Sequence, residues 1–284
     1  MQTPVAIKRA FIQALPTDNP YLSPQYVEVL KDSFKHRPEL IEAYLHGCWD
    51  VFEGARVIIK TTWLREARNI TLYPTGVRRV ISCDPARFGD DETVIYVFEN
   101  TCIIDQRIYG QKRLTHTAGQ CAELARQYTI TGESRDEDYV PVIAVDVDGV
   151  GSGVADDLVS WGFDVMEIHS AAASSEPDRY YNLRAQMWWE AGIKYSEGDI
   201  DEGEHDDPEL DRQLITPQYD FRNGKIIVEE KAEIKDRLKR SPDRADAKIM
   251  GLHALKFART FEEIVGAKRD RWTKKKKARS AWAG

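Results

Sequence analysis

Three segments rich in β-branched and aromatic residues follow one another between residues 79 and 109. They are Arg79–Asp84, Glu92–Glu99 and Thr101–Tyr109, and tight polar links join them. Residues of these types favour strands, and links this short join strands that run in opposite directions. The sequence therefore predicts an antiparallel meander of three strands.

After the meander the pattern changes to alternating helices and strands. Leu114–Ile130 and Gly153–Trp161 are predicted helices, whereas Val140–Asp146 and Phe163–Ile168 are predicted strands. The apolar run in Val140–Asp146 is typical of a strand buried on both faces. Helical crossovers join strands in parallel, so we expect an α/β fold with one mixed sheet flanked by helices.

Further elements are predicted toward the C-terminus. They are a helix over Tyr180–Tyr195, a hairpin over Tyr219–Glu229 that turns at Asn223-Gly224, and a second helix over Lys231–Lys239. Ser241 is a favourable N-cap residue and Pro242 suits the first helical position, which predicts a last helix extending to about Ala258.

Charge is distributed very unevenly along the 284 residues. The net charge of −7 argues against a uniformly basic surface that coats nucleic acid, but 268–284 has a local charge of +7, which leaves −14 elsewhere. We expect this basic tail to be disordered. Glu197–Asp211 contains nine acids and no Lys or Arg, with glycines and a proline between them, and is predicted to be a solvated loop.

Hydrophobic residues make up 42% of the chain, enough for a buried core, and no run approaches the roughly 18 apolar residues of a membrane span. We therefore expect a soluble, cytoplasmic protein. The cysteines lie far apart without a C-x-x-C pair, which indicates reduced thiols rather than a zinc knuckle or a disulfide scaffold. They are Cys48, Cys83, Cys102 and Cys121.

Two aspartates occur where a predicted strand meets a glycine-containing loop. Asp84 ends the first strand of the meander, and Asp146 ends the first strand after it. If those strands pair, they lie about 4.8 Å apart, so both carboxylates could bind one metal ion. Asp243 and Asp246 are spaced i, i+3 at the start of the last predicted helix, and they would complete a cluster if that helix abuts the strand ends.

Such a cluster needs cations, because like charges at close range raise each other's pKa values or bind a metal. Oxygen-rich sites select Mg²⁺ or Mn²⁺, and two such ions support phosphodiester hydrolysis. An acid at a strand end is also a common turn or cap residue, and this alternative stays open for each aspartate. Asp91 and Asp148 flank the cluster and are expected in turns or as partners of the ligands.

Five regions, in this order, resemble the C-terminal nuclease domain of tailed-phage terminase large subunits, the packaging motors that cut concatemeric DNA. The first is the linker between ATPase and nuclease, the second, third and fifth are acidic motifs, and the fourth is a helix between them. The regions are DNPYLSPQYVEVL with LHGCWDVFEGA, SCDPARFGDDETVI, VIAVDVDGVGSGVADDL, YYNLRAQMWWEAG and RLKRSPDRADAKIMG. These nuclease domains resemble Holliday-junction resolvases in fold, and both are grouped in an RNase H-like superfamily.

The resemblance implies an RNase H-like fold with sheet order 3-2-1-4-5. It also implies a connector at 1–62, a nuclease domain at 63–266 and the basic tail at 267–284. Asp84, Asp146 and Asp246 would hold two Mg²⁺ or Mn²⁺ ions, with Asp243 as a fourth carboxylate. The expected activity is endonucleolytic cleavage of double-stranded viral DNA during genome packaging.

The partners expected from the resemblance are double-stranded DNA, the portal protein, the terminase small subunit and an ATPase domain. No G-x-x-x-x-G-K-[S/T] loop occurs, and the glycines of 149–153 lack its lysine, so we expect no ATP hydrolysis by this chain. Two alternatives remain open: a structure-selective nuclease similar to Holliday-junction resolvases, and a non-catalytic module of a packaging motor.

Basic residues between Lys231 and Lys248 adjoin the third acidic motif and could lead DNA to the metals. Arg184, on the helix with two tryptophans, could also contact a phosphate, whereas the tryptophans are expected in the core. The remaining predicted DNA contacts are Lys235, Arg237, Lys239, Arg240 and Arg244. An ordinary solvated helix face explains them equally well. Phosphate contacts carry no sequence information, so little sequence specificity is expected.

Overall fold

The computed structural model describes residues 15–35, 41, 44–45, 56–86, 91–132, 138–203 and 206–264. The chain divides into two compact units, Met1–Arg56 and Val57–Gly284. In the first unit a 3-10 turn, Pro16–Asp18, precedes α1, Pro24–Ser33. The helix begins there because Ser23 Oγ accepts the Gln25 amide at 3.3 Å.

The second unit is built on a five-stranded sheet of order β3-β2-β1-β4-β5. The strands are β1 (Arg79–Asp84), β2 (Thr93–Glu99), β3 (Cys102–Tyr109), β4 (Val142–Asp146) and β5 (Val165–Ile168). Strands β1, β2 and β3 form an antiparallel meander, while β4 pairs in parallel with both β1 and β5. The predicted meander, the mixed sheet and the order 3-2-1-4-5 are therefore confirmed.

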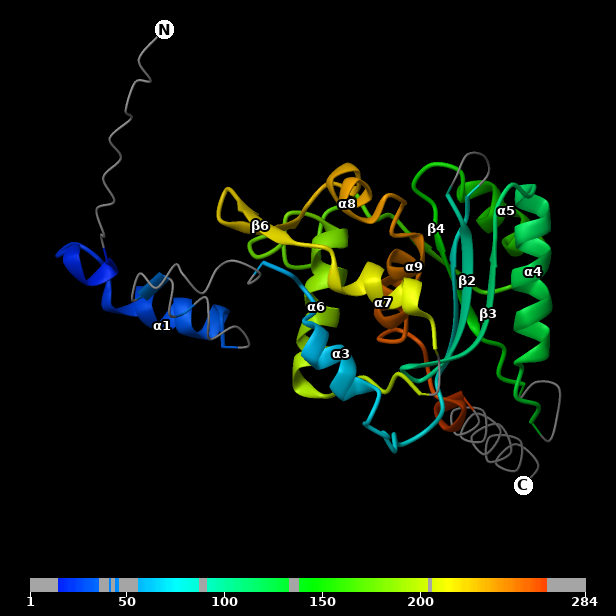
Figure 1. Cartoon of the computed structure of the whole chain (residues 1–284). Coiled ribbons are helices and arrows are strands. Elements are labelled where there is room, and N and C mark those ends of the chain that lie inside the picture. Colours follow the sequence, from blue (N-terminus) through cyan, green and yellow to red (C-terminus); the bar gives the residue numbers. More distant parts are fainter. Residues whose placement is uncertain are drawn as a thin grey trace, which may run out of the picture. The chain divides into compact units, whose positions relative to one another are not determined.

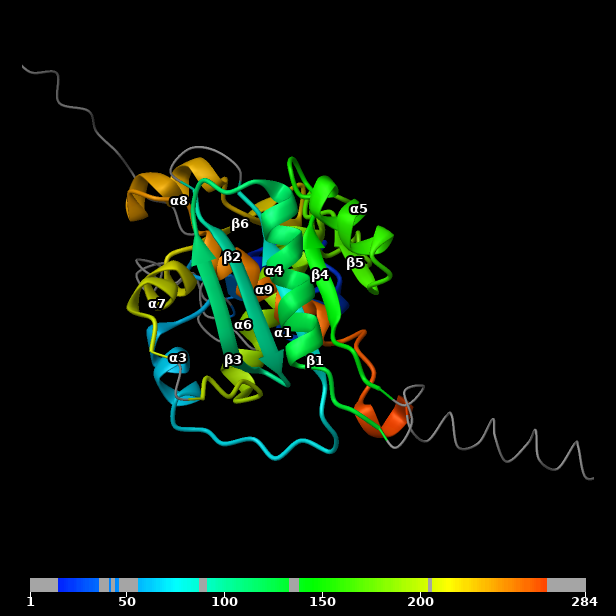
Figure 2. The same cartoon turned by 90° about the vertical axis from the view of Figure 1, so that its right-hand side faces the viewer.

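Helices cover both faces of this sheet (Figures 1 and 2). On one face lie α4 (Leu114–Gln127) and α5 (Ser152–Ser160), and on the other α9 (Asp243–Ala254) packs against β1, β2 and β4. Alternate side chains of β1 point to opposite faces of the sheet, so Ile81 and Cys83 pack in the core beneath α4 and α5. The outer layer beyond α9 includes α6 (Leu183–Glu197).

Close contact between α9 and the sheet depends on a glycine. A Cβ atom on Gly251 would overlap the ring of Phe98, which is fully buried on β2. Glycine therefore lets the helix backbone lie directly against this aromatic ring, which brings the first turn of α9 close to the end of β1.

The remaining elements of the second unit lie on the same side of the sheet as α6 and α9 (Figure 1). The predicted hairpin is present, and its Asn223-Gly224 turn has positive φ at both residues, as a tight hairpin turn requires. Helix α9 begins two residues after Ser241 and ends at Ala254 instead of Ala258. These elements are α3 (Thr61–Ala67), α7 (Pro208–Ile215), β6 (Tyr219–Arg222), β7 (Lys225–Val228) and α8 (Lys231–Leu238). A domain boundary after residue 62 would cut α3.

The acidic block at 197–211 is not a solvated loop, and that prediction is wrong. Its second half enters α7, and Glu202 and Asp207 are buried. Cations from distant segments neutralise the acids, as Lys248 does for Glu202 at 2.5 Å. The composition of the block could not indicate these pairs, because the cations lie in other parts of the chain.

Several expectations concern residues outside the described ranges, including the basic tail at 267–284, most of the motif at 45–55, and Cys48. The three other cysteines are free thiols. Within the described part of the chain, no helix combines the length and apolar character needed to cross a membrane.

Candidate functional site

Asp84 and Asp146 lie side by side at the C-terminal ends of two neighbouring inner strands of the sheet. They end β1 and β4, which pair in parallel with Cys83 opposite Val145, so the next residue along each strand is an aspartate. The chain then leaves β4 through a tight turn in which a Cβ on Gly151 would overlap the Asp146 carbonyl oxygen. The turn therefore holds the end of β4 directly against the start of α5.

Helix α9 brings two further aspartates to these strand ends. Asp246 lines one cavity together with Asp84 and Asp146. Asp243, one turn earlier on α9, lines a second cavity of about 340 Å³ together with Asp84. Asp84 and Lys231 line both cavities, which shows that the two are adjacent. The structure thus brings all four predicted aspartates to one region.

Asp246 is held by three side chains that donate to it or carry positive charge. Trp188 Nε1 donates to Oδ1 at 3.0 Å, and Lys231 Nζ lies 2.9 Å from Oδ2. Arg184 Nη2 lies 3.7 Å from Oδ1. Burial raises the pKa of Asp246, but Lys231 and Arg184 outweigh that effect and lower it below its ordinary value. This carboxylate is therefore charged and oriented before any ligand binds.

Asp84 and Asp146 have the opposite electrostatics. Burial, opposed by Lys231 and assisted by neighbouring carboxylates, raises the pKa of Asp84 well above its ordinary value. Asp84 Oδ2 is buried with no hydrogen-bond partner among the described residues. Burial likewise raises the pKa of Asp146 to about 6, although the Asp148 amide donates to its Oδ1 at 3.0 Å. Lys231 favours the ionised form of both carboxylates, but it does not outweigh the effect of burial.

The residues flanking the cluster have defined contacts. Asp148 Oδ2 accepts the Ala171 amide at 2.9 Å, so Asp148 anchors the segment after β5 to the turn after β4. Asp243 Oδ2 accepts the Glu92 amide at 2.8 Å, and Ser241 donates to Oδ1. Asp91 pairs with Lys235 at 3.1 Å. These contacts fix the turns around the four aspartates.

Several of the predicted DNA contacts already have partners in the protein. Arg237 pairs with Glu229, and Arg240 lies 2.8 Å from Glu92. Arg244 pairs with Glu92 and Asp207. Lys235 is half-exposed beside Asp91, and the neighbouring Lys239 is exposed with a φ of 62°. Their binding to DNA stays a prediction.

Arg184 differs from the other predicted DNA contacts because it lines the cavity that contains Asp84, Asp146 and Asp246. Its Nη1 donates to the Glu229 carbonyl at 2.9 Å. Its Nε and Nη2 are buried without a hydrogen-bond partner among the described residues. Since Nη2 lies 3.7 Å from Asp246 Oδ1, Nε is left as the unpaired donor of this guanidinium at the cavity, among the described residues.

Lys231 is the main site residue that sequence reasoning did not single out. Its side chain is 48% exposed, yet its ammonium contacts Asp246 and lowers the pKa of Asp84. It was one of several lysines and arginines in a basic stretch, and only the fold shows that it faces the aspartates. Trp188 is in the core as predicted, but its Nε1 also contacts Asp246.

Comparison with solved structures gives matches to the nuclease domain of a large terminase subunit from a bacterial virus. One is the large terminase subunit domain of bacteriophage Sf6 with calcium, with 21% identity and a TM-score of 0.53 over 69% of this chain and 98% of that chain. The same domain with manganese matches with 20% identity and a TM-score of 0.52 over the same shares. The chain therefore has the RNase H-like fold of terminase nuclease domains. No family model and no curated protein matches it.

Proposed function

We propose that this chain is a metal-dependent endonuclease that cleaves double-stranded DNA during viral genome packaging. One observation carries the proposal: Asp84 places a buried, unpartnered carboxylate oxygen beside Asp146 and Asp246 at the strand ends of an RNase H-like sheet. An ionisable oxygen in such a place is costly unless a cation binds there. The Sf6 domains of the same fold were studied with calcium and with manganese.

The donor atoms of the candidate ligands suit Mg²⁺ or Mn²⁺. All four candidate ligands are carboxylates, which these hard cations prefer, and no His or Cys among the described residues lines either cavity. In the proposed site Asp84, Asp146 and Asp246 hold two ions, and Asp243 assists beside Asp84. Two such ions can activate water and stabilise the leaving oxygen of a phosphodiester.

The chain's own residues orient the ligands and receive the substrate. Trp188 holds Asp246 through one oxygen, and the turn after β4 holds Asp146. The Nε donor of Arg184, which has no hydrogen-bond partner among the described residues, supports a contact to a DNA phosphate. Exposed Lys235 and Lys239 would bind the backbone further out, and such contacts read no sequence. By resemblance, the portal protein, the small subunit and a separate ATPase domain are the proposed packaging partners.

Lys231 provides a first test of the metal site. Among the described residues no three His, Cys, Asp or Glu side chains are close enough to hold one ion, and the Lys231 ammonium lies against Asp246. Replacing Lys231 with alanine should lower the melting temperature of the metal-free protein, because Asp246 loses its nearest cation. Manganese should then raise the melting temperature more than in the wild type, because the carboxylates have no competing ammonium.

The matched control for this experiment is Lys235→Ala, one turn later on α8, where the lysine pairs with the half-exposed Asp91. Its response to manganese, measured by differential scanning fluorimetry, should equal that of the wild type. Equal manganese shifts in Lys231→Ala and Lys235→Ala would contradict a metal site at Asp246.

The proposed activity is tested with supercoiled plasmid and purified protein in Mn²⁺ or Mg²⁺. Cleavage is expected with either ion, and it should disappear in EDTA and in Asp146→Asn. A four-way junction of the same sequence, assayed in parallel, separates general duplex cleavage from a resolvase-like preference. Cutting that persists in EDTA would refute metal dependence, whereas no cutting with any divalent ion would refute the nuclease proposal.

A further inference from the structure

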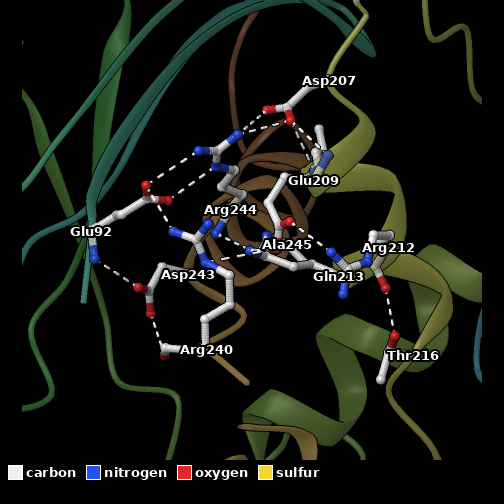
Figure 3. A network of polar contacts seen from close by, with 12 residues as sticks. Glu92, Asp207, Glu209, Arg212, Gln213, Thr216, Arg240, Asp243, Arg244 and Ala245 are labelled. Carbon is white, nitrogen blue, oxygen red and sulfur yellow. Dashed lines mark hydrogen bonds and ion pairs between the residues drawn. The ribbon is translucent and has the colours of Figure 1, made fainter. Parts of the chain in front are cut away.

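The first turn of α9 is capped by a side chain from another helix (Figure 3). Gln213 Oε1, on α7, accepts the backbone amides of Arg244 at 2.9 Å and Ala245 at 3.2 Å. The first amides of a helix have no partner within the helix, and Pro242 at the N-cap provides no side-chain acceptor. Gln213 is 0% exposed, so these two bonds are shielded from water. Helix α7 therefore supplies the cap that the sequence of α9 lacks.

Arg244 ties the same turn to two other segments. Its Nε lies 3.0 Å from Glu92 Oε2, and its Nη1 lies 2.8 Å and 3.0 Å from the two oxygens of Asp207. The Asp207 side chain is 6% exposed and that of Arg244 is 18% exposed. Removing the positive charge would leave a buried carboxylate unpaired, which is strongly unfavourable. Arg244 is thus a fixed bridge between the start of β2 and the start of α7.

Glu92 connects this bridge to the aspartate cluster. Its carboxylate binds Arg244, while its backbone amide donates to Asp243 Oδ2 at 2.8 Å (Figure 3). One residue therefore contacts two successive residues of α9, each through a different group. Arg244 and Arg240 together hold the Glu92 carboxylate, so loss of the Arg244 contact would loosen the residue whose amide orients Asp243.

We propose that Gln213 and Arg244 are positioning residues that set the affinity of the site for divalent ions by holding Asp243 in place. The inference rests on the proposed function, because it takes Asp243 as one of the carboxylates that face the metal. It assigns Arg244 a role within the protein instead of a contact with DNA. It also assigns a role to Asp207, in the acidic segment before α7, because the Asp207 carboxylate pairs with Arg244 and holds it in place.

The contacts of Asp207 permit a selective test. Its Oδ1 accepts the Glu209 and Leu210 amides, both at 3.0 Å, and so caps α7. Asparagine retains that acceptor oxygen but loses the charge that pairs with Arg244. Asp207→Asn should therefore keep α7 folded while loosening Arg244. Gln213→Leu tests the other link, because it removes the acceptor from α9 with little change in volume.

The experiment is a titration of each purified full-length variant with Mn²⁺ by isothermal titration calorimetry, well below the melting temperature. Gln213→Leu and Asp207→Asn should bind Mn²⁺ about 10- to 100-fold more weakly, as expected for residues that orient metal ligands. The control is Arg212→Gln on α7, which removes an exposed pair with Glu209 and should leave the affinity within about twofold of the wild type.

Far-UV circular dichroism identifies the folded variants, and an unchanged Mn²⁺ affinity in a folded Asp207→Asn protein would overturn the inference. If Gln213→Leu fails to fold, Asp207→Asn and Arg244→Lys decide the question, since lysine keeps the charge but cannot bridge both carboxylates. A wild-type protein that binds no Mn²⁺ also overturns the inference. A wild-type protein that binds Mn²⁺ but cuts no DNA refutes only the proposed function.

Discussion

Replacing Asp84 with asparagine should abolish DNA cleavage and yet raise the melting temperature of the metal-free protein at pH 8. Cleavage should fall by more than about 100-fold, because even residues that only orient metal ligands contribute about 10- to 100-fold. The gain in stability follows from burial, which raises the pKa of Asp84 well above its ordinary value. Asparagine has nearly the same shape and never carries the penalised charge.

The same shift predicts how the stability of the metal-free protein depends on pH. A carboxyl group whose pKa is higher in the folded state binds its proton more tightly there, so the free energy of unfolding decreases as the pH rises through the folded pKa. Asp146, with a pKa raised to about 6, acts in the same direction. In EDTA, Asp84→Asn should therefore lose less stability than the wild type between pH 5 and pH 8.

These effects are measured as plasmid cleavage rates in Mn²⁺ and as melting temperatures in EDTA across that pH range. The exposed Asp156 of α5 provides the control, because Asp156→Asn should change neither quantity. A less stable Asp84→Asn protein at pH 8 would mean that the carboxylate serves the fold. Retained cleavage would remove Asp84 from the proposed metal site.

A second large effect is expected from Gly151→Ala. The added Cβ would overlap the carbonyl oxygen of Asp146, and its next neighbours include the carbonyl carbon of Asp146 and the ring of Pro85. Backbone atoms cannot rotate away as a flexible side chain can, so either the end of β4 or the first turn of α5 must move. We expect a loss of about 3 kcal/mol or more in the free energy of unfolding.

The measurement is urea unfolding followed by circular dichroism, with Gly119→Ala as the matched control. Gly119 lies within α4, and a Cβ there meets no atom within 4 Å. Alanine at this position should stabilise the protein by about 0.5–1 kcal/mol, because glycine is unfavourable inside a helix. Equal stability of Gly151→Ala and the wild type would show that the turn after Asp146 is adaptable.

Local sequence patterns predicted the sheet and the strand-end aspartates because their signals lie within short windows. Alternating β-rich and helical segments predicted the meander and a mixed sheet through general rules of connection, and Asp84 and Asp146 follow directly at the strand ends. The strand order 3-2-1-4-5 came from the resemblance to terminase nuclease domains. Clustering of all four aspartates then required only that α9 pack near β1. The fold and the location of the candidate site could thus be predicted together.

The partners of these aspartates could not be predicted, because they come from distant parts of the chain. Lys231, the first residue of α8, contacts Asp246 on α9, and Gln213 on α7 caps α9. The acidic block was taken as a loop because Arg244 and Lys248, which neutralise two of its acids, lie some 40 residues later in the sequence. Charge pairing of this kind depends on tertiary packing, which residue patterns do not encode.

The parallel pairing of β1 with β4 also determines when the site can form during folding. In the sequence, β2, β3 and α4 lie between Asp84 and Asp146. A long loop must therefore close before these two residues come into contact. A chain in which only the meander has formed would contain Asp84 without Asp146 beside it. At the proposed metal site we therefore expect divalent ions to bind after β4 has paired with β1, and to slow unfolding rather than nucleate folding.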